Sequence, residues 1–167
     1  MVVYIFDTNA LSLILRYYYP GIFPKFWKKF NGDISHGAIT SVRHVQREIN
    51  NWDNKRIDRS WIKKNKHIFT RPTKADEKYV AELLACDDGS GLRISKKGKP
   101  RDDFFLADPW LIAKAYAIKG TVVTEETREP EFTKLIGSYS KIPDVCDNRE
   151  IPCINLEKFM SEKKWVF

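Results

Sequence analysis

The feature that most constrains this chain is an unbroken apolar run at residues 2–6, Val-Val-Tyr-Ile-Phe, which ends directly at Asp7. The run is rich in β-branched and aromatic residues and does not alternate with polar ones, so it predicts a strand buried on both faces of a parallel sheet. Thr8 and Asn9 continue with helix-capping side chains, and the apolar residues at 10–15 predict a helix. We therefore expect an early strand–helix unit whose junction carries a carboxylate.

The rest of the chain continues this alternation of strands and helices. Helices are predicted at about 23–30 (ended by a turn at Asn31-Gly32-Asp33), 42–52, 57–69, 74–85, 108–118 (closed by Gly120) and 156–163, and strands at 37–40, 121–124 and 151–154. Such alternation predicts an α/β fold with a mainly parallel sheet. Because the connections are short, residues 1–167 are expected to form a single domain.

Composition limits the class of protein. The three cysteines, Cys86, Cys146 and Cys153, cannot all pair and form no CxxC motif, so reduced thiols are expected rather than disulfides or a zinc site. No stretch approaches the ~20 apolar residues of a membrane-spanning helix, and the first apolar run is too short for a signal peptide. We expect a soluble, cytoplasmic protein with no membrane partner. The formal net charge of +7 favours a polyanion such as nucleic acid as partner, although it can also serve solubility alone.

Acidic residues lie where several predicted elements begin or end. Asp7 follows the first strand, Asp108 opens a helix, and Glu125 and Glu126 follow the strand at 121–124. Ligands gather at the carboxyl ends of parallel strands, which favours a shared site for these acids. Each also has a structural explanation, because Asp7 and Asp108 can cap helices and the two glutamates can be ordinary loop acids.

A further acid, Glu48, lies in the helix predicted at 42–52. The apolar stripe of that helix runs through Val42, Val45, Ile49 and Trp52. Glu48 falls on the flank of the stripe, where it can reach the mouth of a cleft or remain a solvated surface charge.

Four short motifs, taken in order, resemble those of the PIN-domain family. They are Asp7-Thr8-Asn9-Ala10-Leu11, Val45-Gln46-Arg47-Glu48-Ile49, Ala107-Asp108-Pro109-Trp110-Leu111 and Val122-Val123-Thr124-Glu125-Glu126. The resemblance covers nearly the whole chain, and residues 142–146, 153–156 and 165–167 resemble a less-studied branch of the VapC-like toxins. The chain departs from the family at the fourth acid, often Asp or Asn, which is here Glu126 with Glu125 as a competing candidate. Its insert between Glu48 and Asp108 is also longer than in compact members.

The resemblance implies a three-layer α/β/α fold around a mainly parallel sheet, and a metal-dependent endoribonuclease that leaves 5′-phosphate and 3′-hydroxyl ends. The implied ligands of Mg²⁺ or Mn²⁺ are Asp7, Glu48, Asp108 and, at a weaker second site, Glu126, with Asn9 and Thr124 in support. Hard carboxylate oxygens select these ions over zinc. Packed carboxylates also raise one another's pKa unless a cation neutralises them. The family further implies an RNA substrate, a cognate antitoxin protein and a homodimer.

Contacts to RNA are predicted at two basic segments. Their cations are Lys63 and Lys64 in the first, and Lys96, Lys97, Lys99 and Arg101 in the second, where positive charge can follow a phosphate backbone. Trp61, Phe104 or Phe105 can stack on unpaired bases, or belong to the core. Two rival functions stay open: a non-catalytic RNA-binding or scaffolding domain whose acids cap helices, and a structure-selective DNA nuclease that uses the same carboxylates.

Overall fold

A computed structural model describes residues 1–52, 57–85, 106–128 and 141–167. Five parallel strands form one sheet in the order β3-β2-β1-β4-β5. The strands are β1 (Tyr4–Phe6), β2 (Ile39–Val42), β3 (Phe69–Thr70), β4 (Thr121–Val123) and β5 (Cys153–Ile154). Tyr4 lies opposite both Ile39 and Thr121, so the first strand of the chain is central. The predicted buried strand and the parallel sheet are both confirmed.

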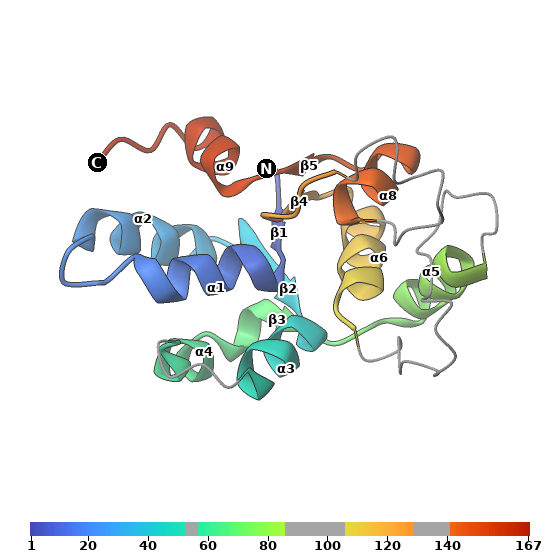
Figure 1. The fold of residues 1–167 in the computed structure, drawn as a ribbon, viewed down its shortest axis with the longest axis horizontal. Helices are drawn as coiled ribbons and strands as arrows, with labels where there is room; N and C mark the ends of the chain where they lie inside the picture. The colour runs from blue at the N-terminus through green and yellow to red at the C-terminus, as the bar shows by residue number, and fades with distance from the viewer. Residues whose placement is uncertain (53–56, 86–105, 129–140) are drawn as a thin grey trace.

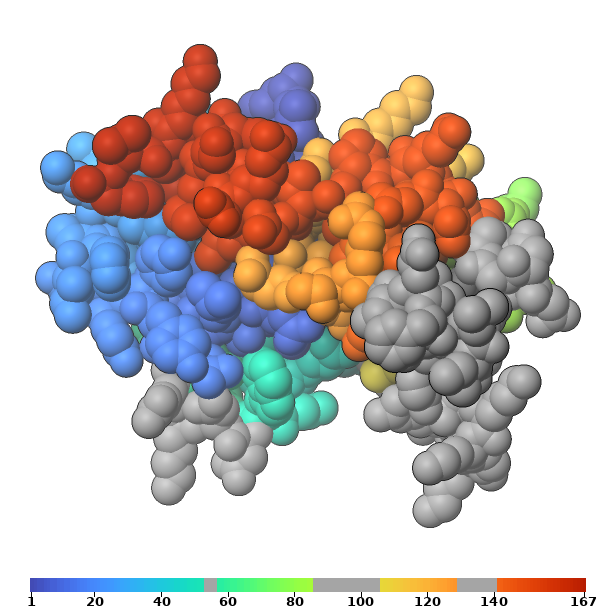
Figure 2. Space-filling model, turned by 45° about the horizontal axis from the view of Figure 1, so that its top comes forward, coloured from blue at the N-terminus to red at the C-terminus, as the bar shows by residue number. Residues whose placement is uncertain are grey.

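Helices cover both faces of this sheet (Figure 1). They are α1 (Thr8–Tyr17), α2 (Pro24–Ser35), α3 (Arg43–Asn51), α4 (Arg59–Lys64), a short 3-10 helix (Lys66–Ile68), α5 (Lys74–Ala85), α6 (Asp108–Ile118), α8 (Ile142–Asn148) and α9 (Leu156–Glu162). The helices α1 and α2 lie on one side of the strands, and α5 and α6 lie on the other. Figure 2 shows the C-terminal segment, in red, against α1 and α2, in blue. Within the described ranges, no helix is long and apolar enough to cross a membrane.

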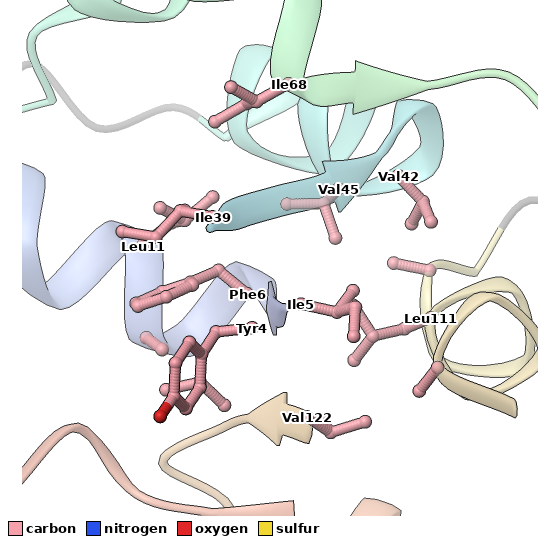
Figure 3. Packing of buried hydrophobic residues seen from close by; sticks show 14 of the residues in the cluster. Tyr4, Ile5, Phe6, Leu11, Ile39, Val42, Val45, Ile68, Leu111 and Val122 are labelled. Atoms are coloured by element: carbon pink, nitrogen blue, oxygen red, sulfur yellow. The ribbon is translucent and has the colours of Figure 1, made fainter. Parts of the chain in front are cut away.

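The core is built on both faces of β1. Because side chains alternate along a strand, Tyr4 and Phe6 share one face, where both meet the ring of Phe159 edge-on, at centroid distances of 4.8 and 5.0 Å. Ile5 points to the other face, toward Leu111 of α6 (Figure 3). All three β1 residues are buried, which accounts for the unbroken apolar run in the sequence.

Several predicted boundaries were wrong. The expected turn at Asn31-Gly32-Asp33 is helical, because α2 continues to Ser35. Phe26, Phe30 and Ile34 are all buried along one side of α2, and this packing outweighs the turn preference of Asn, Gly and Asp. The helix predicted at 57–69 divides into α4, the 3-10 helix and β3. The helix α8 was not predicted.

The topology brings the ends of β1 and β4 together. The chain leaves β1 toward β2 and β3 on one side, and returns to β4 and β5 on the other. In open parallel sheets, such a reversal of strand order leaves a crevice at the carboxyl edge. The helix α6 precedes β4, so it must begin at this same edge. Asp7, Asp108 and residues 124–126 are thereby placed around one crevice.

Candidate metal and nucleic-acid site

Asp7 is both a helix cap and a buried carboxylate of the crevice. Its Oδ1 accepts the N–H of Thr8 at 2.5 Å, and its Oδ2 accepts the hydroxyl of Thr124 at 2.9 Å and the N–H of Asn9 at 3.4 Å. Its pKa is raised to about 6, chiefly by burial and also by the charge of Glu126, while the hydrogen bonds from Thr124 and Thr8 act to lower it. The capping explanation and the site explanation therefore both describe Asp7.

Asp108 is the first residue of α6 rather than its cap, which is Ala107. No donor among the described residues hydrogen-bonds to its carboxylate. Its pKa is raised to about 8, chiefly by burial and also by the charges of Asp7, Glu126 and Glu48, while the charge of Lys141 acts to lower it. The capping explanation does not apply to Asp108, and the repulsion expected among packed carboxylates is present at this residue.

Glu48 joins two segments that are far apart in the sequence. One of its oxygens accepts the Thr8 hydroxyl, and the other accepts the N–H of Ala107 at 2.8 Å. Glu48 thus holds the beginnings of α1 and α6 together. It also lines the crevice beside Asp7 and Asp108, as its place on the flank of α3 suggested.

Glu125 and Glu126 have different partners although they are neighbours. Glu125 accepts the N–H of Leu156 at 2.8 Å, at the start of α9. Glu126 accepts the N–H of Ile142 at 3.0 Å, at the start of α8, and its own N–H donates to the Thr124 hydroxyl at 3.1 Å. The charge of Glu126 acts on both Asp7 and Asp108, whereas that of Glu125 acts on Tyr18.

Two adjoining hollows open at this edge. The carboxylate hollow, of about 790 Å³, is lined by Asp7, Thr8, Asn9, Arg47, Glu48, Asn51, Trp52, Leu106 and Asp108. The basic hollow, of about 470 Å³, is lined by Asn9, Ser12, Leu13, Arg16, Tyr17, Trp52, Glu125, Glu126, Thr127 and Lys141. Both share Asn9 and Trp52. Figure 2 shows α1 (blue), α3 (teal) and the segment after β4 (orange) meeting on the face that carries them.

The acids fit a hard divalent cation by chemistry rather than as a preformed cluster. No group of three or more His, Cys, Asp or Glu side chains among the described residues is arranged to hold a metal ion as it stands. Both oxygens of Glu48 and one of Glu126 already accept hydrogen bonds. The carboxylates of Asp7 and Asp108, in contrast, lie in one hollow and repel each other, which is the situation that Mg²⁺ or Mn²⁺ relieves.

The residues that were predicted to contact RNA do not line either hollow where the structure describes them. Lys96, Lys97, Lys99 and Arg101, with Phe104 and Phe105, lie outside the described residues. Lys63 and Lys64 are exposed in the last turn of α4 but line neither hollow. The suggestion that Trp61 stacks on bases was wrong, because it is 7% exposed and packs on Phe30 and Trp27 in the core.

Trp52 was assigned to the apolar stripe of its helix, and this was also wrong. It caps the end of α3 with an extended backbone, so its ring leaves the stripe and is 40% exposed between the hollows. The cations of the hollows, Arg16, Arg47 and Lys141, were not singled out either. Arg47 lies inside the second motif, next to Glu48, and that adjacency was the one signal that pointed to any of them.

Comparison with known proteins supports the fold. The crystal structure of VapBC2 from Rickettsia felis bound to a DNA fragment from their promoter is similar over 92% of this chain and 98% of that chain, with a TM-score of 0.52 and 16% identity. The likeness confirms an α/β fold with helices around a parallel sheet. No curated protein matches the sequence. The family described as "Domain of unknown function (DUF4411)" matches residues 4–167, and this chain belongs to that family.

Proposed function

We propose that this chain is a Mg²⁺- or Mn²⁺-dependent endoribonuclease of the PIN kind, and the toxin of a toxin–antitoxin pair. The observation that carries the proposal is the environment of Asp108. A half-buried carboxylate that accepts no hydrogen bond from the described residues, and that three other acids repel, is costly for a protein to keep without a purpose. The other acids have structural bonds that could explain them, and Asp108 has none within the described ranges.

The hydrogen bonds of Glu48 and Glu126 suit a metal held largely by water. Mg²⁺ is commonly bound through one or two carboxylates, with water and substrate phosphate filling its other positions. Asp7 and Asp108 are the direct ligands in this proposal, and Glu48 and Glu126 act through water. The charge of Glu126 acts on both Asp7 and Asp108, which supports it, rather than Glu125, as the fourth acid.

The residues of the crevice have separable tasks in the proposed hydrolysis. The ion supplies activation of water and stabilisation of the leaving oxygen when it is bound. Thr124 and the first N–H groups of α1 hold the Asp7 carboxylate in place. Asn9 lines both hollows, where its amide can orient a water or a carboxylate. Water adds at phosphorus and the bond to the 3′-oxygen breaks, which leaves 5′-phosphate and 3′-hydroxyl ends.

The hydrogen bonds of the acids are also compatible with the alternative of a non-catalytic domain. Asp7, Glu48, Glu125 and Glu126 all accept backbone N–H groups near helix starts, as expected of acids with purely structural tasks. A non-catalytic RNA-binding or scaffolding domain would need nothing more. Asp108 separates the two readings, since its removal should cost such a domain nothing.

The deciding experiment uses Asp108→Asn, which disturbs no hydrogen bond between described residues. Labelled structured and single-stranded RNAs, with matched DNAs, are incubated with the full chain in Mn²⁺, Mg²⁺ or EDTA. We expect RNA cleavage that needs metal and falls by about 10²–10⁴-fold in the variant, since metal-assisted charge stabilisation contributes several kcal/mol. The matched control is Asp147→Asn, an exposed aspartate that lines neither hollow.

Other outcomes are equally informative. Equal cleavage by the wild type and Asp108→Asn would overturn the proposal. Preference for the matched DNA would favour the structure-selective DNA nuclease. Binding of RNA without cleavage in either metal would favour the scaffolding domain.

The biological part of the proposal rests on the fold. A protein with the same arrangement occurs in a VapBC complex, and by this analogy our chain would act in the cytoplasm, as a homodimer, under the control of an antitoxin protein. Expression of the wild-type chain should arrest growth, and expression of Asp108→Asn should not. Sedimentation of the purified chain tests the dimer.

A further inference from the structure

Trp52 is placed as a platform between the two hollows. It is the most exposed tryptophan of the chain at 40%, whereas Trp27, Trp61 and Trp110 are at most 8% exposed and Trp165 is half-buried. The backbone N–H of Trp52 donates to the carbonyl of Glu48, one helical turn earlier, at 3.0 Å. Residues one turn apart lie about 5–6 Å from each other. The exposed ring therefore lines the same hollow as the carboxylates of Asp7, Glu48 and Asp108.

The basic hollow on the far side of Trp52 is suited to an anion. Arg16 donates from Nη2 to the Tyr17 hydroxyl at 2.9 Å, while its Nε is buried and has no acceptor among the described residues. A guanidinium is charged at every working pH and binds phosphate oxygens strongly through its N–H donors. Lys141 brings a second positive charge to the same hollow.

The glutamates of this hollow offset those cations only in part. Glu125 and Glu126 each accept the first N–H of a helix, α9 and α8 respectively. The partial positive charge of a helix start offsets part of each carboxylate. Arg16 and Lys141 remain available to a ligand.

We infer that the two hollows hold consecutive nucleotides of single-stranded RNA, with an unpaired base stacked on Trp52 and the adjoining phosphate held by Arg16 and Lys141. The inference rests on the proposed ribonuclease and specifies its substrate class. A base that stacks on an exposed side chain has left its own helix, so duplex RNA cannot occupy the platform. The path crosses from the carboxylate hollow, where the scissile phosphate lies, over Trp52 into the basic hollow.

Binding is measured without cleavage, in the Asp108→Asn background, with single-stranded RNA of about ten nucleotides and the same RNA annealed to its complement. We expect the single strand to bind at least about tenfold more tightly, and to protect tryptophan fluorescence from acrylamide. Trp52→Ala should abolish that protection and weaken binding about tenfold or more, since one stacked base contributes that much. Trp52→Phe, which keeps a ring, should restore most of the affinity. The control is Tyr19→Ala, because Tyr19 is an aromatic residue that is 54% exposed and lines neither hollow.

The cations are tested through salt. Arg16→Gln and Lys141→Gln should each reduce the slope of log Kd against log salt concentration by about one, because each removes one phosphate contact. Lys78→Gln, an exposed lysine on α5 that lines neither hollow, should leave the slope unchanged.

The outcomes distinguish this inference from the proposed function. A wild-type chain that cleaves RNA, with Trp52→Ala unchanged in Kd and KM, would overturn the inference alone. Binding that depends on Trp52, in a wild-type chain that never cleaves, would support the inference and overturn the nuclease. Equal affinity for the single strand and the duplex would overturn the inference in either case.

Discussion

The body of the sheet and its carboxyl edge differ in how neighbouring side chains interact, although the two regions meet between consecutive residues, Phe6 and Asp7. Phe6 is fully buried and contacts the rings of Phe30 and Phe159. The next residue, Asp7, is almost as buried, but it faces Asp108, which shares its sign of charge. In the body, neighbours stabilise one another, and at the edge they repel. Substitutions in the body should therefore change the free energy of unfolding without changing the activity of each folded molecule. Substitutions of the edge acids should lower activity and raise the free energy of unfolding.

The largest effect is expected from Phe159→Ala in the body. The side chain is fully buried against Tyr4 and Phe6, so its loss should lower the free energy of unfolding by about 3–5 kcal/mol. Denaturant unfolding measures this, and RNA cleavage per folded molecule should not change. Phe167→Ala is the matched control, because that ring is 53% exposed. Equal losses from both variants would contradict the assignment of Phe159 to the core.

Asp108→Asn should raise the free energy of unfolding, by an amount that depends on pH. The folded pKa is about 8 against an ordinary 3.8, so below pH 4 both states are protonated and Asp108 has no effect. Between these values only the unfolded state loses its proton, so the wild type loses stability as pH rises, fully so above pH 8. The variant should thus be more stable by about 1–3 kcal/mol at pH 8, and by little at pH 4, in EDTA. A constant difference across this range would refute the repulsion among the acids.

Gly120→Ala tests the amino end of the same sheet. A Cβ there would lie 2.9 Å from the carbonyl oxygen of Val3 and clash with the side chain of Ile5. We expect a loss of about 1–3 kcal/mol in thermal or denaturant unfolding, with activity per folded molecule intact. Gly32→Ala, in a helix with open space around the new methyl group, should instead stabilise by about 0.5–1 kcal/mol. Equal signs for the two would argue against close packing at Gly120.

The smallest effect is expected from Thr124→Val. It removes the hydroxyl that bonds Asp7, at a cost of about 1 kcal/mol, and should raise the pKa of Asp7 above about 6. The acidic limb of the pH–cleavage profile should then move to higher pH. Thr40→Val removes a comparable bond to Ile68, far from the acids, and should leave that profile in place. A profile that moves in both variants, or in neither, would break the link between Thr124 and the site.

The spacing of apolar residues was sufficient to predict secondary structure where one helix or strand period continues over the whole element. The helix predicted at 74–85 begins at Lys74 as expected and reaches the end of that described range at Ala85, because its buried side chains recur at helical spacing. The two-residue strand β3 offers no period at all. The closure of α6 is a mixed case: Gly120 was expected to supply the left-handed turn, but Lys119 takes it at a φ of 52°. Glycine is required one residue later for close approach, which depends on Val3 and Ile5.

The site divides in the same way. The acids were proposed because ordered motifs named them. Their hydrogen-bond partners could not be predicted, since Thr8–Glu48 and Thr124–Asp7 join residues that are 40 and 117 positions apart. Trp52 and Trp61 show the cost of this limit. Both residues lie in segments with helical apolar spacing. The extended backbone at the end of α3 exposes Trp52, whereas packing against α2 buries Trp61.

The pairing of β1 with β4 also bears on the order of events during synthesis. Residues 4–6 leave the ribosome early, yet one side of this central strand finds its partner only when residues 121–123 have followed. Glu126 comes later still, and it is followed by residue 142, whose N–H it accepts. A growing chain that has exposed only its first hundred residues holds two of the four acids and no crevice. If the proposed chemistry is correct, translation must pass residue 142 before that copy of the chain can attack RNA.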